Sequence, residues 1–296
     1  MGILVASVRG DFVARVTGLD LARPLDEGAF NQVRDAFHRY AVLVFPEQAL
    51  TDEQQIAFSE RFGPLEVSIR KHRPRAVERA EVSDLSNVDA DGRLYAPSDE
   101  RAIYNAGNRL WHSDSSFKRV PAMASLLSGR EVPPHGGETE FADLRAAWDA
   151  LPPDRTHGLD ALVAEHSFVY SRGLIGYDQF TDEERAMIPP VQQAVVRIHP
   201  ATGRKSLYVG SHASYIIGRP VEAGRTLLNE LLEFATQPRF VYTHAWKRND
   251  LVMWDNRCVL HRGRPWDEER HRRVMHRTTV AGSGPTVVDG RPIAAG

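Results

Sequence analysis

A histidine and an aspartate lie two residues apart in the segment Trp111-His112-Ser113-Asp114. In an extended segment, side chains at positions i and i+2 point the same way, so the imidazole and the carboxylate can reach one metal ion. A chain with 12 histidines is expected to contain such a pair by chance. The pair therefore needs a third ligand before it indicates a metal site.

His261 is the candidate third ligand. It ends a short apolar run that follows the apolar segment 251–254 and a polar turn, where a histidine can also be a core residue. Two histidines and one carboxylate fill one face of an octahedral ion and leave three positions open, which is typical of non-haem Fe(II) oxygenases. Zinc is less favoured, because it usually takes four N or S ligands and the chain has one cysteine.

Two arginines downstream of His261 are suited to bind a carboxylate near such an ion. A 2-oxo acid that occupies two of the open positions leaves one for O₂ and needs a cation at its far carboxylate. Arg273 and Arg277 are four residues apart and share a face of an extended chain, and the planar guanidinium matches a carboxylate. Val274 and Thr278 alternate with them, which favours a half-buried strand over a pair of surface arginines.

The roles of two other residues, Thr139 and Cys258, stay open on the sequence alone. Thr139 follows the Gly136-Gly137 turn and begins a strand, so it is a possible carboxylate partner that spacing alone does not select. Cys258 is either a nucleophile or a small buried hydrophobic residue. Its apolar neighbours Val259 and Leu260 favour the second interpretation.

Short segments rich in β-branched and aromatic residues dominate the chain and must position these side chains. Such segments are residues 41–45, 123–127, 140–142, 165–170, 194–199, 205–209, 240–246, 250–254 and 274–281. Helical spacing, a Thr51/Gln54 capping box and Pro220 predict helices at residues 26–40, 51–62 and 220–235. The expected fold is therefore mainly β with flanking helices.

The least regular part of the sequence is Ser68–Arg109, which mixes basic and acidic residues. It is expected to be a long loop, either a solvated surface loop or an active-site lid, and its place just before His112 favours the lid. Internal repeats and Gly/Ser linkers do not occur, so residues 1–296 are expected to form a single domain.

Composition excludes several classes of protein. The 37 Lys and Arg against 39 Asp and Glu give a net charge of −2, which provides no general attraction for nucleic acid or anionic lipid. One cysteine rules out an intrachain disulfide framework, and neither a signal peptide nor an apolar run of membrane-spanning length is present. The cytoplasm is the expected location.

Several motifs together resemble the taurine dioxygenase / 2,4-dichlorophenoxyacetate dioxygenase family over almost the whole chain. They are FGPLE (62–66), LWHSDSSF (110–117), GGETEF (136–141), GRK (203–205), GSHAS (210–214) and MWDNRCVLHRGR (253–264). These motifs are most similar to the phenoxyacetate branch. Two segments depart from it: VMHR (274–277) resembles the taurine branch more, and VSIR (67–70) differs from both.

The resemblance implies a double-stranded β-helix, a cupin-like jelly roll with flanking helices. It also implies that Fe(II) is held by His112, Asp114 and His261, and that Thr139 and Arg273 hold the distal carboxylate of the co-substrate 2-oxoglutarate, with O₂ as the second co-substrate. Similarity to the family further suggests a homo-oligomer.

Substrate-binding roles also follow from the resemblance. Arg277 is expected to meet the anionic group of the substrate, with Lys71, Asn108 and the backbone at Ser115 lining the same site. The implied reaction hydroxylates the ether-side carbon of an aryloxyacetate and gives a phenol and glyoxylate, with succinate and CO₂ from 2-oxoglutarate. Taurine, an alkylsulfonate or an alkyl sulfate is the alternative substrate. A metal-binding jelly roll without oxygenase activity, or a cupin-type metal hydrolase, is the alternative of another class.

Overall fold

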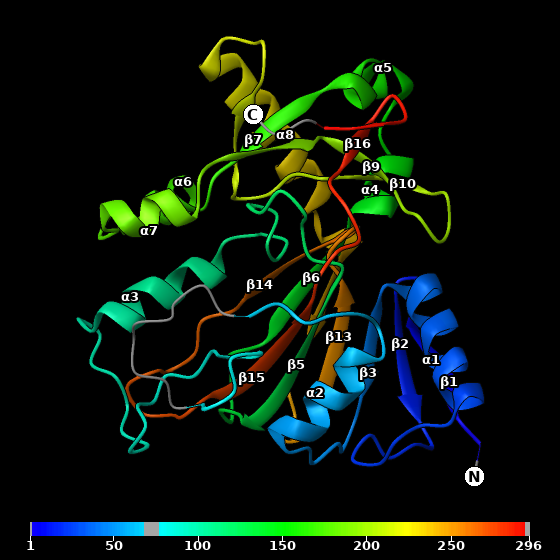
Figure 1. Cartoon of the computed structure of the whole chain (residues 1–296), viewed down its shortest axis with the longest axis vertical. Helices are drawn as coiled ribbons and strands as arrows, with labels where there is room; N and C mark the ends of the chain where they lie inside the picture. The colour runs from blue at the N-terminus through cyan, green and yellow to red at the C-terminus, as the bar shows by residue number, and fades with distance from the viewer. Residues whose placement is uncertain (1, 68–76, 294–296) are drawn as a thin grey trace.

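The computed structural model describes residues 2–67 and 77–293. Its largest sheet has seven strands and forms the lower half of the molecule in Figure 1. In sheet order the strands are β1 (Leu4–Arg9), β2 (Val13–Thr17), β3 (Val42–Phe45), β13 (Leu251–Asp255), β5 (Ala124–Glu131), β15 (Val274–Val280) and β4 (Val82–Asp84). All neighbours in this sheet pair antiparallel except β2 and β3, which are parallel.

A second, smaller sheet faces the first. It contains β12 (Val241–His244), β6 (Thr139–Asp143) and β14 (Val259–Gly263), with β6 in the middle and both pairings antiparallel. The buried Phe141 of β6 packs against Trp254 of the large sheet, with 5.5 Å between ring centroids. The two facing sheets form the jelly roll that the family resemblance implies.

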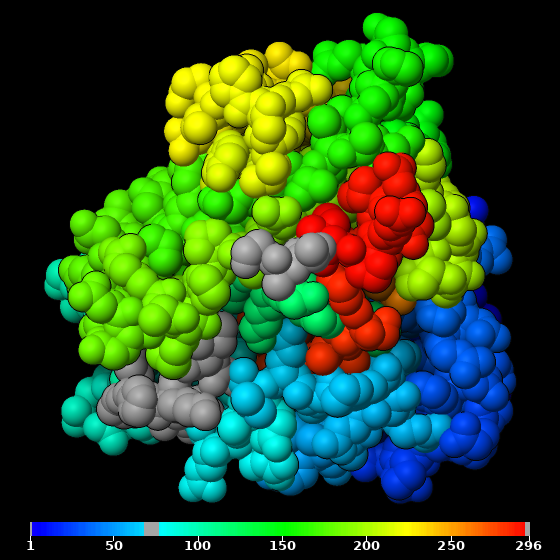
Figure 2. Space-filling view, turned by 45° about the horizontal axis from the view of Figure 1, so that its top comes forward, coloured from blue at the N-terminus to red at the C-terminus, as the bar shows by residue number. Residues whose placement is uncertain are grey.

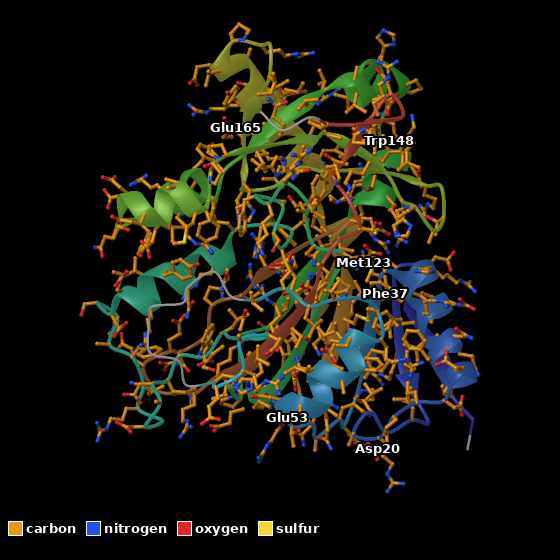
Figure 3. All side chains as sticks on the ribbon, viewed as in Figure 1. Asp20, Phe37, Glu53, Met123, Trp148 and Glu165 are labelled. Atoms are coloured by element: carbon orange, nitrogen blue, oxygen red, sulfur yellow. The ribbon has the colours of Figure 1, made fainter. Side chains whose placement is uncertain are left out.

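Two helices cover the outer face of the large sheet, α1 (Glu27–Tyr40) and α2 (Asp52–Glu60). Helix α1 begins at Asp26, whose side chain accepts from the backbone N–H of Ala29, and α2 begins at the predicted capping box of Thr51 and Gln54. The side chains of this layer are drawn in Figure 3, which labels Phe37 of α1. Both helices lie where the sequence places them, within two residues at each end.

Strand β13 contributes side chains to two separate hydrophobic cores, one on each face of the large sheet. All five of its residues are buried, which explains the continuous apolar run Leu251-Val252-Met253-Trp254. Successive strand residues point to opposite faces. Leu251 and Met253 accordingly join the core under α1 and α2, whereas Val252 and Trp254 join the core between the two sheets.

Most of the remaining elements form the upper part of Figure 1, which has its own hydrophobic core beside α8 (Val221–Ala235). The helices of this part are α4 (Leu144–Asp149), α5 (Pro153–Thr156), η2 (Leu159–Ala161), α6 (Phe168–Gly173), α7 (Asp182–Met187), α8 (Val221–Ala235) and η3 (Pro238–Phe240). The strands are β7 (Val163–His166), β8 (Val191–Ala194), β9 (Val196–Ile198), β10 (Lys205–Leu207), β11 (Ala213–Ile216), β16 (Val287–Val288) and β17 (Arg291–Pro292).

The C-terminal residues, red in Figure 2, lie on the surface between this part and the large-sheet half of the molecule. The Thr286 hydroxyl ties them to β8, because it donates to Gln193 and accepts from the backbone N–H of Ala194. Among the described residues, no helix combines the length and the apolar character that a bilayer crossing requires.

The predicted strand at residues 165–170 is wrong in its second half. Strand β7 ends at His166, and α6 begins at Phe168. The Ser167 hydroxyl accepts from the backbone N–H of Tyr170, which is an N-cap. This local hydrogen bond outweighs the β propensity of the aromatic and β-branched residues that follow.

The prediction of one long loop at Ser68–Arg109 is also wrong in part. Residues 68–76 lie outside the described part, but the rest includes β4, the helix α3 (Glu100–Asn105) and the 3-10 turn η1 (Ala106–Arg109). Helix α3 begins at Asp99, whose carboxylate accepts from the backbone N–H of Arg101 at 2.8 Å. Asp99 is an N-cap residue, but in the sequence it could not be distinguished from the other charged residues around it.

Candidate metal centre

The three predicted ligands meet at one buried point. Potential ligand atoms of His112, Asp114 and His261 all lie within 4.8 Å of one another, and each residue is at most 6% exposed. His112 and His261 form an antiparallel bridge, with N–H···O distances of 3.1 and 2.9 Å in the two directions. The His112 segment thus extends the small sheet beyond β14, and Asp114 follows at the start of a turn.

The histidine rings are oriented for metal binding. Nδ1 of His112 lies 2.7 Å from the carbonyl oxygen of Leu110, so this nitrogen donates and Nε2 keeps its lone pair. Nε2 of His112 is 3.9 Å from one carboxylate oxygen of Asp114, and Nε2 of His261 is 3.6 Å from the other. Three donors of this kind on one side of an ion fit Fe(II).

A hydrogen-bond network holds Asp114. Its carboxylate accepts from the Ser125 hydroxyl at 2.6 Å, and its backbone N–H donates to the side-chain oxygen of Asn256 at 3.1 Å. Asn256 also donates to Ser125 and accepts from the Trp254 indole, so its amide is fixed on both sides. All three supporting side chains are fully buried, and such support fixes the geometry of a ligand.

The electrostatics suit a cation. Burial lowers the pKa of His112 and, further, that of His261, so both rings are neutral at neutral pH and can act as ligands. Burial alone would raise the pKa of Asp114, but the positive charge of Arg277, together with the hydrogen bond from Ser125, holds it well below its usual range. Arg277 forms a direct ion pair with this carboxylate.

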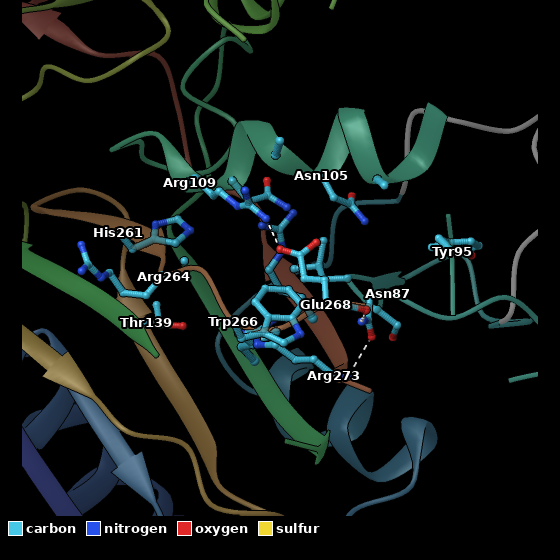
Figure 4. A pocket seen from close by; sticks show the side chains of 18 of the residues that line it. Asn87, Tyr95, Asn105, Arg109, Thr139, His261, Arg264, Trp266, Glu268 and Arg273 are labelled. Carbon is cyan, nitrogen blue, oxygen red and sulfur yellow. Dashed lines mark hydrogen bonds and ion pairs between the residues drawn. The ribbon is translucent and has the colours of Figure 1, made fainter. Parts of the chain in front are cut away.

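A cavity of about 340 Å³ opens on the two histidines, which is within the range that holds small organic molecules. Thr139, Arg273 and Arg277 line it, as does Asn108. Figure 4 shows the cavity below α3 and η1, with Thr139 and His261 on one side and Arg273 beside Trp266 on the other. An ion pair between Arg109 of η1 and Glu268 spans it.

Arg273 is a buried cation that forms no ion pair with any residue that the structure describes. Its guanidinium lies over the Trp266 ring at 5.1 Å, and its Nε donates to the carbonyl oxygen of Gly137 at 3.2 Å. Burial lowers the pKa of Arg273 to about 10, an effect that the charge of Glu268 opposes. The side chain therefore remains charged at neutral pH and favours an anionic ligand.

The other residues predicted to bind 2-oxoglutarate or the substrate differ in where they lie relative to the cavity. Thr139 is 3% exposed and accepts from the indole N–H of Trp246 at 3.0 Å. Ser115 does not line the cavity: its φ is 55°, and its hydroxyl donates to Glu66 at 2.6 Å. Lys71 lies outside the described residues.

Asp255 and Cys258 form a second group with His199, which is not suited to a metal ion. Asp255 already accepts from His199 at 2.9 Å and from two nitrogens of Arg257. The two positive charges of Arg257 and the nearby Arg145 oppose a further cation. Burial raises the pKa of the Cys258 thiol, which fits the predicted buried hydrophobic residue.

Several residues that support the site were not predicted. Ser125, Asn256 and Trp246 each bond a predicted site residue, and Asn87 accepts from the backbone N–H of Arg273 at 2.7 Å. Asn256 lies inside the MWDNRCVLHRGR motif, so its place between Trp254 and His261 was a usable signal. The other three stand in segments without a recognisable pattern.

Comparison with known proteins agrees with this geometry. The family model described as taurine catabolism dioxygenase TauD, TfdA family matches residues 5–279. The alpha-ketoglutarate-dependent 2,4-dichlorophenoxyacetate dioxygenase of Burkholderia sp. (strain RASC) is 47% identical over 271 residues, which are 91% of each chain. The (S)-phenoxypropionate/alpha-ketoglutarate-dioxygenase of Sphingobium herbicidovorans is 42% identical over 287 residues, which are 94% of each chain.

A solved structure gives the same result. AAD-2, crystallised with Mn(II) and N-oxalylglycine, matches with a TM-score of 0.89 at 49% sequence identity, over 97% of this chain and 99% of that one. These two ligands are analogues of Fe(II) and 2-oxoglutarate, the latter also called alpha-ketoglutarate. Because the family model covers nearly the whole chain and relatives above 40% identity cover nine tenths of it, this chain belongs to the TauD/TfdA family of Fe(II)- and 2-oxoglutarate-dependent dioxygenases.

Proposed function

We propose that this dioxygenase hydroxylates the ether-side carbon of an aryloxyacetate such as 2,4-dichlorophenoxyacetate. The observation that carries the proposal is the 47% identity to a 2,4-dichlorophenoxyacetate dioxygenase over nine tenths of both chains. The cavity supports it, because it combines arginines, Arg273 and Arg277 among them, with apolar walls such as Leu85, Leu127 and Trp254. An aryloxyacetate has one carboxylate and one apolar ring to match.

In this proposal His112, Asp114 and His261 hold Fe(II), and Thr139 and Arg273 bind the distal carboxylate of 2-oxoglutarate. The bound metal with O₂ and 2-oxoglutarate supplies the oxidant that removes hydrogen from the substrate, while 2-oxoglutarate becomes succinate and CO₂. Ser125 and Asn256 would keep Asp114 in place for this chemistry, since they bond its carboxylate and its backbone. The chain's part is to bind and orient.

Arg277 is the proposed partner of the substrate carboxylate. It lies on β15 beside Leu127 of β5, and its Nη1 contacts Asp114. Within the described part of the chain its buried Nε has no hydrogen-bond partner, so the guanidinium can accept a further anion. A carboxylate held there would place the adjacent methylene close to the metal site.

The reaction balances without a general base. Substrate, 2-oxoglutarate and O₂ give the hydroxylated ether, succinate and CO₂, and one oxygen atom enters each organic product. The hydroxylated ether is a hemiacetal, which breaks its carbon–oxygen bond to release the phenol and leaves glyoxylate. Helix α3 and η1 cover the cavity, and the exclusion of water there would protect the reaction from side products.

The test is succinate formation by the Fe(II)-loaded protein with 2-oxoglutarate and O₂. 2,4-Dichlorophenoxyacetate should stimulate succinate, with phenol and glyoxylate appearing in equal amounts. Taurine and an alkyl sulfate are the parallel substrates. Stimulation by either of these alone would reject the aryloxyacetate, and no succinate with any substrate, despite bound iron, would favour a metal-binding jelly roll without oxygenase activity.

A further inference from the structure

We infer that Trp246 is a positioning residue for 2-oxoglutarate, which acts by directing the hydroxyl hydrogen of Thr139 into the cavity. The inference rests on the proposed role of Thr139 at the distal carboxylate. Trp246 itself lies just after β12, is partly buried, and is not among the residues that line the cavity.

The direction of one hydrogen bond carries the argument. An indole N–H can only donate, whereas a threonine hydroxyl can donate once and accept. Nε1 of Trp246 lies 3.0 Å from Oγ1 of Thr139, so the threonine oxygen is the acceptor in this bond. The hydrogen of Thr139 is thereby left for another acceptor, and the residue lines the cavity in which a carboxylate is expected. The indole selects the donor role of the hydroxyl.

The indole is held in place from behind. Its ring meets His244 edge to face, with 4.7 Å between centroids and an interplanar angle of 89°. His244 is tied to Asp250 at 3.1 Å, and the same Asp250 oxygen accepts from the backbone N–H of Lys247. A Cβ at Gly129 of β5 would lie 3.3 Å from the indole, so this strand approaches the ring as closely as a glycine allows. Trp246 therefore has little freedom to turn away.

A second indole near the cavity shows why packing alone is an insufficient explanation for the contact between Trp246 and Thr139. The other proposed carboxylate ligand, Arg273, is also supported by an indole, but Trp266 offers that guanidinium its ring face. Trp246 instead directs its single polar atom at Thr139. Packing by the ring does not require this hydrogen bond. A change that removes the N–H and keeps the ring therefore separates a packing role from a positioning role.

The experiment is a double-mutant cycle on the Mn(II)-loaded protein, read out as the Kd of 2-oxoglutarate by titration calorimetry. The variants are Trp246→Phe, Thr139→Val and both together. Trp148→Phe is the matched control, because Trp148 packs in the separate core around α8. Each single variant at 246 or 139 should weaken binding about 10-fold, the lower range for loss of a supporting hydrogen bond. The double variant should bind no worse than Thr139→Val.

Trp246→Phe also removes part of a ring, so a second replacement keeps the shape. Site-specific 3-benzothienylalanine at position 246 exchanges the N–H for sulfur in a ring of the same outline. This replacement should weaken the binding of 2-oxoglutarate to the same extent as phenylalanine does. The KM for 2-oxoglutarate should rise, and kcat at saturation should be unchanged.

The outcomes are distinguishable. Losses that add in the double variant, or wild-type affinity with 3-benzothienylalanine, would overturn the inference and leave Trp246 as a packing residue. Weak binding by Thr139→Val with normal binding by Trp246→Phe would overturn the inference while the proposed function stands. Normal binding by Thr139→Val would remove the proposed role of Thr139 and the inference with it.

Discussion

Asp114 receives contacts from three sides, and each has a different consequence. Ser125 bonds its carboxylate, Asn256 bonds its backbone, and Arg277 neutralises its charge. Hydrogen bonds to a metal ligand typically contribute 10- to 100-fold to metal affinity or activity. The hydroxyl of Ser125 is the simplest of the three to remove, because alanine keeps the strand, although the amide of Asn256 then loses one acceptor.

Ser125→Ala should weaken the binding of Mn(II) at least 10-fold. The matched control is Ser128→Ala on the same strand. Ser128 is equally buried but three residues away, so it points to the opposite face. Calorimetric titration of Mn(II) into both variants is the measurement. A similar loss in both would mean that β5 tolerates no change, and that the Ser125 hydroxyl has no special role.

Arg277→Gln should raise the KM for the aryloxyacetate by about 10- to 100-fold, which corresponds to a lost charge-assisted hydrogen bond of about 1.5–3 kcal/mol. The KM for 2-oxoglutarate should change much less, because Arg273 is the proposed ligand of that co-substrate. Steady-state kinetics with each substrate varied in turn separate the two. Arg272→Gln, at a half-exposed arginine paired with Glu131, is the control. Equal effects on both KM values would contradict the assignment.

At the scale of elements, one side chain secures the connection between β14 and β15. The amide of Asn87 donates to the carbonyl oxygens of Glu268 and His271 at 3.1 and 2.9 Å, and its oxygen accepts from the backbone N–H of Arg273. Three bonds from one residue fix the backbone that carries Arg273. The connection is otherwise outside regular structure.

Asn87→Ala should therefore weaken the binding of 2-oxoglutarate about 10-fold, because the backbone that carries Arg273 becomes less rigid, with little effect on Mn(II) binding. Loss of these three part-buried hydrogen bonds should also lower the free energy of unfolding by about 1–3 kcal/mol. Asn229→Ala on the exposed side of α8 is the control. Titration of each ligand and urea unfolding are the measurements. A matching loss of Mn(II) affinity would indicate general disorder of the site.

The elements also show what the sequence could and could not predict. The apolar run of β13 and the capping box of α2 are local patterns, and both elements were placed correctly. Helix α6 was missed because the single hydroxyl of Ser167 decides it against the propensity of its neighbours. Helix α3 was missed because Asp99 looked like one more charge in a charged segment.

The same distinction holds within the site. His112, Asp114 and His261 follow from residue type and spacing, whereas Thr139 needed the family resemblance. Trp246 and its partner Thr139 are 107 residues apart in sequence, so their hydrogen bond has no local signature. The pairing of β12 with β6 brings the two segments together.

At the scale of the whole molecule, buried histidines gather around the candidate metal centre. His166, His212, His112 and His261 are each at most 6% exposed. Burial lowers the pKa of all four, and that of His166 to about 3, with the charge of Arg197 adding to the effect. The folded chain thus binds protons at these rings less readily than the unfolded chain does.

The metal-free protein should therefore lose stability as the pH falls below about 6.5, the usual pKa of histidine, towards 3. Each ring contributes up to about 1.4 kcal/mol per pH unit. Urea unfolding between pH 7 and 5 measures the slope. His166→Gln should reduce the slope by the contribution of one proton, about 1.4 kcal/mol per pH unit. The same change at the exposed His157 should leave the slope as it is. A pH-independent free energy of unfolding over this range would refute the argument.

Two predictions at this scale are still to be tested. The sequence predicts that the 296 residues form a single domain, and the family resemblance predicts a homo-oligomer. A single cooperative unfolding transition would support the first. Light scattering on the purified protein measures the second, and the mass of one chain, 33.2 kDa, would contradict it.

The bridge between His112 and His261 has a consequence for the lifetime of the protein. The two segments are far apart in sequence, and within the described residues this pair is the only backbone–backbone hydrogen bonding between them. An ion held by both histidines would act as a removable cross-link that closes a long loop, and 100-fold excess over its Kd would add about 2.7 kcal/mol. The melting temperature should rise with Mn(II) concentration, and His112→Ala should abolish the rise. Iron supply would then set how long the folded enzyme survives as well as how fast it works.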